Sequence, residues 1–280
     1  MCMGFGCNAA GVVGCRIIDS PRERLIAILT NCFVPCNGRF PALISIISMF
    51  FIVGCSGFFG TLITAAELTA IILVGIFATF IASKLLSKTV LKGIPSSFTL
   101  ELPPYRKPQI GKTILRSITD RTIFVLGRAA SVAAPAGLII WLMANIQINS
   151  ESLLHICTEF LNPVGELLGL DGTIIMAFIL GFPANEIVIP IIIMSYISSG
   201  TILELSSMLE LKQLLLSNGW TWVTALCFIV FSLMHWPCST TLITIKKETG
   251  SFKWTALAFI LPTIFGALAC LTINGIAHLF

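Results

Sequence analysis

The sequence predicts an all-α polytopic membrane protein, a helical bundle that contains broken or re-entrant helices. Three observations predict this class. Of the 280 residues, 56% are hydrophobic and only 11% are charged, whereas a soluble globular domain carries about 25% charged residues. Several apolar runs exceed the ~18 residues that mark a candidate membrane span. Glycine and proline interrupt the apolar sequence in a pattern that occurs twice along the chain.

Six apolar runs follow one another, and each is long enough for a full crossing or a re-entrant hairpin. They are residues 40–60, 61–82, 122–146, 173–199, 220–236 and 254–280. The chain is therefore expected to be a multi-pass protein of a cell membrane, with the lipid bilayer as its immediate partner.

The charges between these runs predict the orientation of the chain. The linker 83–121 contains eight Lys or Arg residues against two acidic ones, so the positive-inside rule predicts that it is cytoplasmic. Segments 15–39 and 245–253 are also basic and are predicted on the same side. Segment 147–172 carries four acidic residues and no Lys or Arg, and it is predicted outside. Residues 40–82 would then form an out-and-back helical hairpin.

These assignments divide the chain into three parts. Residues 1–82 hold the C-terminal portion of a first repeat and the helical hairpin, and 83–121 form the basic linker. Residues 122–280 hold a second repeat and the C-terminal membrane helices. No basic signal region follows Met1, so the chain is expected to be a fragment or a split subunit of a larger protein.

Composition also argues against several classes of protein. The net charge of +4 does not indicate a nucleic-acid partner, because the basic residues form no face interleaved with aromatic residues. The ten cysteines include no CxxC pair, so a disulfide framework is not predicted. The sequence also lacks a Ser-His-Asp signature, a metalloprotease helix and a Rossmann fingerprint, and an enzyme is not predicted.

The apolar run 173–199 does not fit the predicted topology as a single membrane crossing. If 147–172 is outside and 220–236 crosses inward, this run must begin and end outside, which a continuous helix cannot do. Gly181 and Pro183 supply a break, since glycine loosens a helix and proline removes a backbone donor. We therefore expect a broken or re-entrant element, unwound near mid-membrane from Gly181 to Glu186, with Pro190 as a second break.

A weak internal repeat accompanies this break. The sequence GFGCN at 4–8 matches GFPAN at 181–185 in three of five positions. Each match is followed by a Pro-Cys pair, at 35–36 and at 237–238. Paired interrupted segments of inverted topology are the best sequence indicator of a midplane binding site in transporters. Chance matching in a chain rich in Gly and Cys remains the alternative.

Four ionisable residues fall inside apolar runs: Glu67, Arg128, Glu186 and His235. Each is costly at membrane depth and needs a partner or water. Glu186 either faces a cation or caps the following half-helix. His235 lies close to Cys238, and nitrogen with sulfur suits Fe(II), Zn or Mn better than Na⁺; an interfacial His-Trp anchor is the alternative. Arg128 is expected to pair with a carboxylate and not to contact substrate, and Glu67 is a candidate for that partner.

Five motifs in order resemble the membrane domain of the FeoB-type ferrous iron transporters. They lie at 4–8, at 22–41, at 98–106 (FTLELPPYR), at 181–186 and at 235–251. The resemblance covers most of the chain. It implies two inverted gate-like repeats and uptake of Fe²⁺ across the bacterial cytoplasmic membrane, with Fe²⁺ as the transported ion and no permanently bound cofactor.

The resemblance also implies partners. The family has an N-terminal GTP-binding domain and preceding membrane helices, and neither is present in these 280 residues. A GTP-binding domain or subunit would have to act in trans or belong to a longer chain, and GTPase activity would lie there. The driving force, the oligomeric state, including a homo-oligomer, and the preference among Fe(II), Mn and Zn stay open.

The predicted metal path combines the gate motifs of both repeats. In the family, cysteines at these motifs are proposed to line the pore, which corresponds to Cys7 and Cys238 here, with Cys36 as a further candidate. We expect these residues to approach Asn185 and Glu186 and to coordinate Fe(II) transiently, because the oxygen donors weaken the site. Asn8 and His235 complete the candidate set. The competing hypotheses are a carrier for a small organic solute such as a nucleoside and a transport-inactive membrane fragment.

Overall fold

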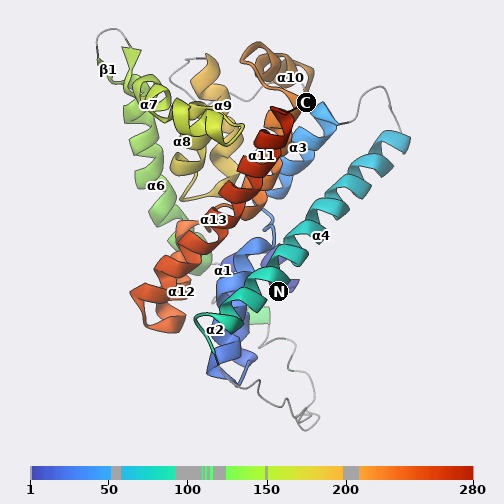
Figure 1. The fold of residues 1–280 in the computed structure, drawn as a ribbon. Coiled ribbons are helices and arrows are strands. Elements are labelled where there is room, and N and C mark those ends of the chain that lie inside the picture. Colours follow the sequence, from blue (N-terminus) through green and yellow to red (C-terminus); the bar gives the residue numbers. More distant parts are fainter. Residues whose placement is uncertain are drawn as a thin grey trace.

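The computed structural model is a bundle of helices in which several helices are interrupted (Figure 1). It describes residues 2–51, 58–92, 124–148, 151–197 and 208–279, together with four isolated positions between 93 and 123. The α-helices are α1 Asn8–Gly14, α2 Pro21–Thr30, α3 Phe40–Phe50, α4 Phe58–Lys88, α6 Phe124–Asn145, α7 Leu153–Leu167, α8 Gly172–Leu180, α9 Val188–Ile197, α10 Met208–Ser217, α11 Trp222–Met234, α12 Ser239–Thr249 and α13 Phe252–Ala277. Short 3₁₀ turns are η1 Cys2–Phe5, η2 Cys15–Ile17, η3 Asn31–Phe33 and η5 Asn185–Ile187, and a small hairpin pairs β1 Gln147–Ile148 with β2 Glu151–Ser152.

The described residues contain three helical segments long and apolar enough to cross a membrane. These are Phe59–Lys88, Trp222–Thr249 and Phe252–Ala277, and the bent pair of α7 and α8 could supply a fourth. The all-α polytopic class is thus confirmed. A single crossing over 40–60 is not found, because α3 ends at Phe50, and a helix of 11 residues is too short to span a bilayer. Residues 52–57 lie outside the described residues.

The two ends of the bundle differ in charge. We call the end that holds α2 and the α12–α13 turn the basic end (Arg16, Arg22, Arg24, Lys246 and Lys247), and the end that holds α7 and the β-hairpin the acidic end (Figure 1). At the basic end, the Arg16 guanidinium donates two hydrogen bonds to Glu248. Helices α2 and α12, from two of the segments predicted inside, therefore lie at the end opposite to α7, from the segment predicted outside, as that topology requires. The membrane side of each end stays a prediction, and most of the linker 83–121 lies outside the described residues.

The run 173–199 is broken, as predicted. Helix α8 ends at Leu180, α9 begins at Val188, and the two helices pack against each other as a hairpin. Gly181 is required at this corner, because a methyl group there would lie 2.6 Å from Val188 Cγ2 and 2.8 Å from the Ala177 carbonyl oxygen. Pro190 does not form a second break. It lies in the first turn of α9, where a backbone N–H has no helical acceptor to lose.

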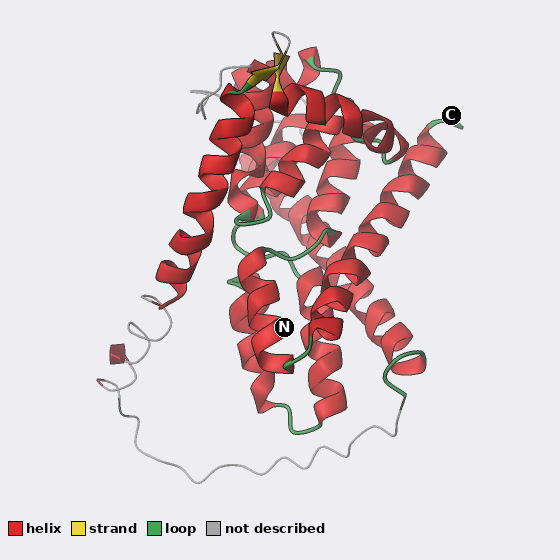
Figure 2. Cartoon of the chain, turned by 90° about the vertical axis from the view of Figure 1, so that its left-hand side faces the viewer, coloured by secondary structure: helices red, strands yellow, loops and turns green. Residues whose placement is uncertain are grey.

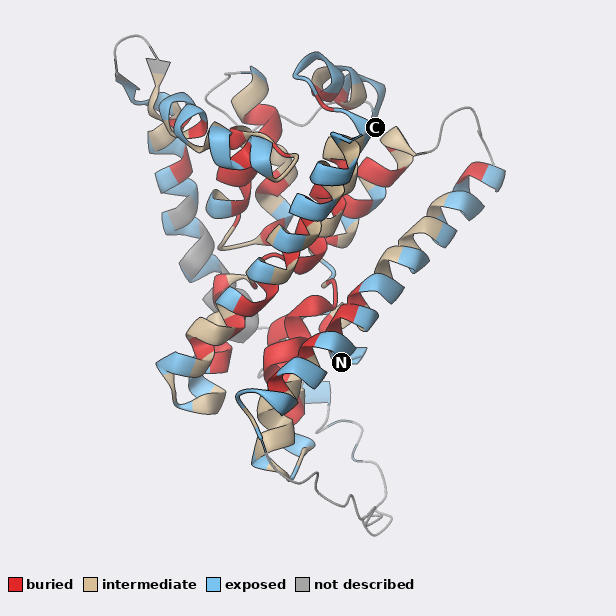
Figure 3. Cartoon of the chain, viewed as in Figure 1, coloured by how far each residue is buried: buried red, intermediate tan, exposed pale blue. Residues whose placement is uncertain are grey.

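The core is divided between the two halves of the molecule. Around α11, the rings of Phe178, Phe228 and Phe231 form one cluster towards the acidic end. A second cluster towards the basic end includes Phe33, which packs edge-on against Phe265 of α13. Helices α4 and α13 keep exposed apolar side chains along much of their length (Figure 3), as expected of surfaces that face lipid or further helices.

Candidate functional site

Two interrupted helices carry the Pro-Cys pairs, and their interruptions lie near the middle of the bundle, where Figure 2 shows loops between helix ends. In the first repeat, α2 continues through η3 and the loop 34–38 into α3. In the second repeat, α11 ends at Met234, and α12 begins at Ser239. We call 34–38 the first break and 235–238 the second break.

The two breaks are bonded to their Gly-Phe segments in nearly the same way. In the first repeat, the Asn37 N–H donates to the Gly6 carbonyl at 3.3 Å. In the second, the Ser239 N–H donates to the Phe182 carbonyl at 2.9 Å. In both cases the residue after the Pro-Cys pair donates, and the two acceptors lie one motif position apart, since Gly6 matches Pro183. A shared main-chain contact of this kind supports a structural repeat over a chance match of five letters.

An asparagine braces each repeat from equivalent motif positions. With its amide oriented to suit its neighbours, Asn8 donates to the carbonyls of Gly4 at 3.1 Å and Val34 at 3.3 Å. Asn185 lies with its Oδ1 3.4 Å from Nε2 of His235 in the second break. Both asparagines are buried, at 3% and 9% exposed. Each therefore connects the start of a half-helix to the neighbouring break.

The two repeats run in opposite directions. Helix α1 starts beside the first break and leads to Arg16, whose partner Glu248 lies at the basic end. Helix α9 starts beside the second break and leads to Tyr196, which hydrogen-bonds the Asp171 carboxylate and accepts a bond from Trp220 Nε1 at the acidic end. The half-helices thus leave the centre towards opposite ends, which is the predicted inverted arrangement.

His235 is a buried packing residue. It is 1% exposed, and its ring contacts those of Phe178, Phe231 and Trp236. Its Nδ1 lies 2.9 Å from the Ser232 carbonyl, which can only accept, so Nδ1 carries the hydrogen. Nε2 is then an acceptor, and it pairs with Asn185 when the amide of that residue is turned so that its Nδ2 donates in place of Oδ1. The interfacial anchor considered for this residue is wrong, because the ring lies inside the core.

Arg39 is a functional candidate that the sequence analysis does not identify. The topology prediction counts it among the charges of a cytoplasmic segment, but it is 1% exposed at the start of α3. Its guanidinium donates to main-chain carbonyls of both repeats. The available signal was its position, directly after the Asn37-Gly38 turn and before an uninterrupted apolar run.

Glu186 and the gate cysteines surround the breaks without forming a closed metal site. Glu186 is exposed and covers Gly38 of the first break, where an added methyl group would lie 3.0 Å from its Oε1. Cys7, Cys36 and Cys238 are half-buried free thiols, and the Cys238 Sγ lies 3.2 Å from Thr241 Oγ1. Among the described residues, no three His, Cys, Asp or Glu side chains lie close enough to hold a metal ion. Coordination by the predicted set stays a prediction.

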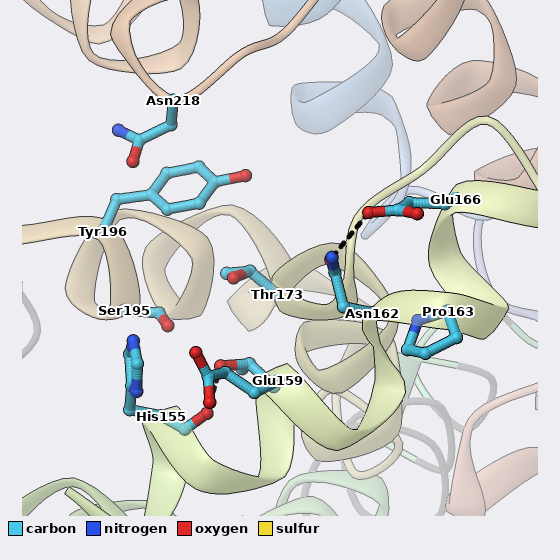
Figure 4. A pocket seen from close by; sticks show the side chains of 10 residues that line it. His155, Glu159, Asn162, Pro163, Glu166, Thr173, Ser195, Tyr196 and Asn218 are labelled. Atoms are coloured by element: carbon cyan, nitrogen blue, oxygen red, sulfur yellow. Dashed lines mark hydrogen bonds between the residues drawn. The ribbon is translucent and has the colours of Figure 1, made fainter. Parts of the chain in front are cut away.

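A separate polar cavity of about 590 Å³ opens at the acidic end (Figure 4). Helix α7 contributes His155, Glu159 and Glu166, and Asn162 donates to Glu166 at 2.7 Å. Ser195 and Tyr196 of α9, Thr173 of α8 and Asn218 complete the polar lining, together with Thr158 and Pro163. Among the described residues that line it there are two carboxylates and no Lys or Arg, so its charge suits a cation.

Comparisons of the sequence with known proteins find similar proteins of one name and two family profiles. A family profile described as "Ferrous iron transport protein B C terminus" matches residues 68–121, and one described as "Nucleoside recognition" matches residues 126–252. An "Fe(2+) transporter FeoB" of Staphylococcus aureus is 31% identical over all of this chain and 40% of its own length. Proteins with the same name from Methanocaldococcus jannaschii and Leptospira interrogans are 28% and 25% identical, over 41% and 42% of their lengths.

The chain spans about 40% of the length of these curated relatives. No solved structure matches it. The resemblance inferred from the gate motifs is confirmed, since the chain is similar over its full length to the C-terminal membrane region of the FeoB-type transporters.

Proposed function

We propose that this chain forms the ion-conducting membrane part of a ferrous iron transporter, with Fe²⁺ as the transported ion. The observation that carries the proposal is the meeting of two inverted, interrupted helices, each with a Pro-Cys pair at its break. Backbone freed from a helix at membrane depth persists only inside a protein or beside a hydrated cavity. Such breaks are where transporters place their substrates.

The donors near the breaks suit a borderline divalent metal. Thiols at Cys7, Cys36 and Cys238 supply soft ligands, and Glu186 with Asn37 supplies exposed oxygen donors. Conduction requires binding weak enough to release the ion.

The polar cavity at the acidic end serves in this proposal as the outer mouth of the path. It lies beside the α8–α9 hairpin, whose tip holds Asn185 and Glu186. The two carboxylates of its described lining, Glu159 and Glu166, would raise the local concentration of a hydrated cation.

The relatives extend well beyond this chain, and the remaining 60% or so of their length would supply the partners. We expect a GTP-binding domain or subunit and additional membrane helices, with this chain itself having no catalytic role. The protein would reside in the cytoplasmic membrane as a multi-pass component.

A nucleoside carrier is the second candidate, because the profile that covers residues 126–252 is described as "Nucleoside recognition". Aromatic and amide groups would then form the site, such as Trp236 and Asn185 at the second break. The two functions differ in their need for thiols, since a nucleoside site would tolerate the loss of Cys7 and Cys238.

Metal uptake by cysteine variants tests the proposal. Uptake of Fe²⁺ is measured with this chain alone and co-expressed with its GTP-binding partner. Cys238→Ser and Cys7→Ser, singly and together, should reduce uptake at normal protein levels, because serine is nearly isosteric but a poor ligand for Fe(II). Cys157→Ser is the matched control, since Cys157 is also half-buried but lies in α7, away from the breaks. Wild-type uptake in the double variant would remove the cysteines from the mechanism.

A further inference from the structure

Arg39 connects the two repeats through its guanidinium. Its Nη1 donates to the carbonyls of Leu233 at 2.9 Å and Cys32 at 3.4 Å. Its Nη2 donates to the carbonyls of Trp236 at 3.3 Å and His235 at 3.5 Å. One acceptor belongs to the first repeat and three belong to the end of α11 and the second break. A single side chain of the first repeat therefore holds the main chain of the second.

Arg39 also stands between the two Pro-Cys pairs. Its backbone N–H donates to the Cys36 carbonyl at 2.9 Å. Its guanidinium bonds Trp236, two residues before Cys238. In the motif alignment set by the Pro-Cys pairs, the equivalent of Arg39 in the second repeat is Thr241, a buried neutral residue that contacts Cys238. The repeats thus differ by one positive charge at matching positions.

Within the part of the chain that the structure describes, no carboxylate forms an ion pair with Arg39. The ion pair found there joins Arg16 to Glu248. Its Nε is also buried without a hydrogen-bond acceptor. Burying a charge without an opposite charge is costly even when hydrogen bonds satisfy its donors. The hydrogen bonds to main-chain carbonyls account for the N–H groups of Arg39. They do not account for its charge, because a neutral amide side chain also donates hydrogen bonds.

We propose that Arg39 is a positioning residue for transport that fixes the spacing of the two Pro-Cys breaks and keeps a permanent positive charge beside them. This inference rests on the proposed metal path. When the thiol of Cys36 or Cys238 releases its proton and holds a divalent cation, the site gains one net positive charge. The fixed charge of Arg39 opposes that gain, so it lowers affinity and favours release of the ion. A path with several binding sites conducts only when each site binds the ion weakly enough for the ion to leave it.

Binding of Co(II) tests the role of the charge. The whole chain is placed in nanodiscs under reducing conditions, and the charge-transfer band of Co(II)–thiolate bonds is titrated. Arg39→Gln should bind Co(II) at least about threefold more tightly than wild type, because a repulsive charge is gone. The same variant should show slower Fe²⁺ uptake with the partner present. Damage to the fold would loosen binding instead, so equal or weaker Co(II) binding by Arg39→Gln overturns the inference.

Arg39→Lys separates spacing from charge and keeps the proposal testable if Arg39→Gln does not fold. Lysine keeps the charge but loses the planar fork, so Co(II) affinity should stay within about twofold of wild type. Cross-linking of Cys36 to Cys238 by a bifunctional thiol reagent, with the other cysteines replaced by serine, should change in yield in both variants. If the cross-linking yield is unchanged in both variants, Arg39 does not fix the spacing of the breaks. If the Co(II) affinity of Arg39→Lys changes more than about threefold, the charge of Arg39 does not set that affinity.

Failure of this inference can be told from failure of the proposed function. A wild-type chain with no Co(II)–thiolate band, or with a band that survives Cys36→Ser and Cys238→Ser together, overturns the metal path and the charge role with it. A wild-type band that depends on these cysteines but is unaffected in Arg39→Gln overturns the inference about Arg39 alone.

Discussion

The two repeats build the same kind of break with different side chains. In the first, Asn8 donates to two main-chain carbonyls, and Gly4 and Gly11 leave room for Asn31 to pack beside it. In the second, Asn185 faces the ring of His235, which an aromatic cluster surrounds. In both, the residue after Pro-Cys donates a bond to the segment that begins with Gly-Phe, to acceptors one motif position apart. The main chain therefore defines the break, and side chains stabilise it by independent means.

The difference predicts unequal sensitivity to substitution. Removing the buried ring from the second break should lower the free energy of unfolding more than removing the amide from the first break. The repeats also differ in charge, since Arg39 of the first corresponds to the neutral Thr241 of the second. The inverted repeats are thus alike in backbone but not in chemistry.

The largest effect is expected for His235→Ala. Removing this buried ring leaves a cavity among Phe178, Phe231 and Trp236 and leaves Asn185 without its partner. We expect a loss of about 3 kcal/mol in the free energy of unfolding. Reversible unfolding in mixed micelles would measure it.

The control for His235→Ala is His235→Phe, which gives the second repeat the residue found at the matching position of the first, Phe33. It keeps the ring but removes the hydrogen bonds to Ser232 and Asn185. The expected loss is about 1–2 kcal/mol. If His235→Phe were as damaging as His235→Ala, hydrogen bonding and not packing would dominate the second break.

A smaller pair of effects is expected at the bracing asparagines. Asn8→Ala removes two hydrogen bonds to buried carbonyls and should cost about 2 kcal/mol, whereas Asn185→Ala removes one long contact and should cost about 1 kcal/mol. Both variants are measured by the same unfolding assay. Equal losses, or a larger loss for Asn185→Ala, would contradict the view that the first break depends more on its asparagine.

Sequence patterns predicted much of this architecture because membrane burial leaves few options. Long apolar runs predicted α6, α11 and α13 within a few residues, and Gly181 with Pro183 predicted the break between α8 and α9. The runs before residue 90 were divided wrongly, since α3 ends at Phe50 and α4 extends to Lys88. Gly54 and Gly57 fall inside the run 40–60 in the sequence, but they were not treated as a helix boundary, and Lys84 was wrongly treated as one.

The site was less predictable than the fold. The gate motifs placed Asn8, Asn185 and Glu186 beside the breaks, as the structure shows. The core position of His235 and the carbonyl partners of Arg39 depend on contacts between residues about 200 positions apart or on neighbouring aromatic rings. A charge count along the sequence treats a buried arginine and a loop arginine alike, so Arg39 was counted as a loop charge.

The smallest effect is expected where the repeats touch, at Gly38. A methyl group there would meet Glu186 Cγ at 2.9 Å and Oε1 at 3.0 Å. Because these atoms belong to an exposed and flexible side chain, Glu186 can turn away, and Gly38→Ala should cost less than about 1 kcal/mol in unfolding free energy. Gly6→Ala is the matched control, since its added methyl would meet its nearest neighbour, the Met3 carbonyl oxygen, at 3.6 Å.

A double-mutant cycle decides whether Glu186 lies over Gly38. In a Glu186→Ala background the obstructing atoms are gone, so Gly38→Ala should lose its cost, and the coupling between the two sites should be about 0.5–1 kcal/mol. Gly6→Ala should show no coupling to Glu186→Ala. Additive effects of Gly38→Ala and Glu186→Ala would mean that the side chain does not cover the first break. Arg39 and the packing of α11 against α3 would then hold the two repeats together without this contact, and Glu186 would be free to bind the ion from the second repeat alone.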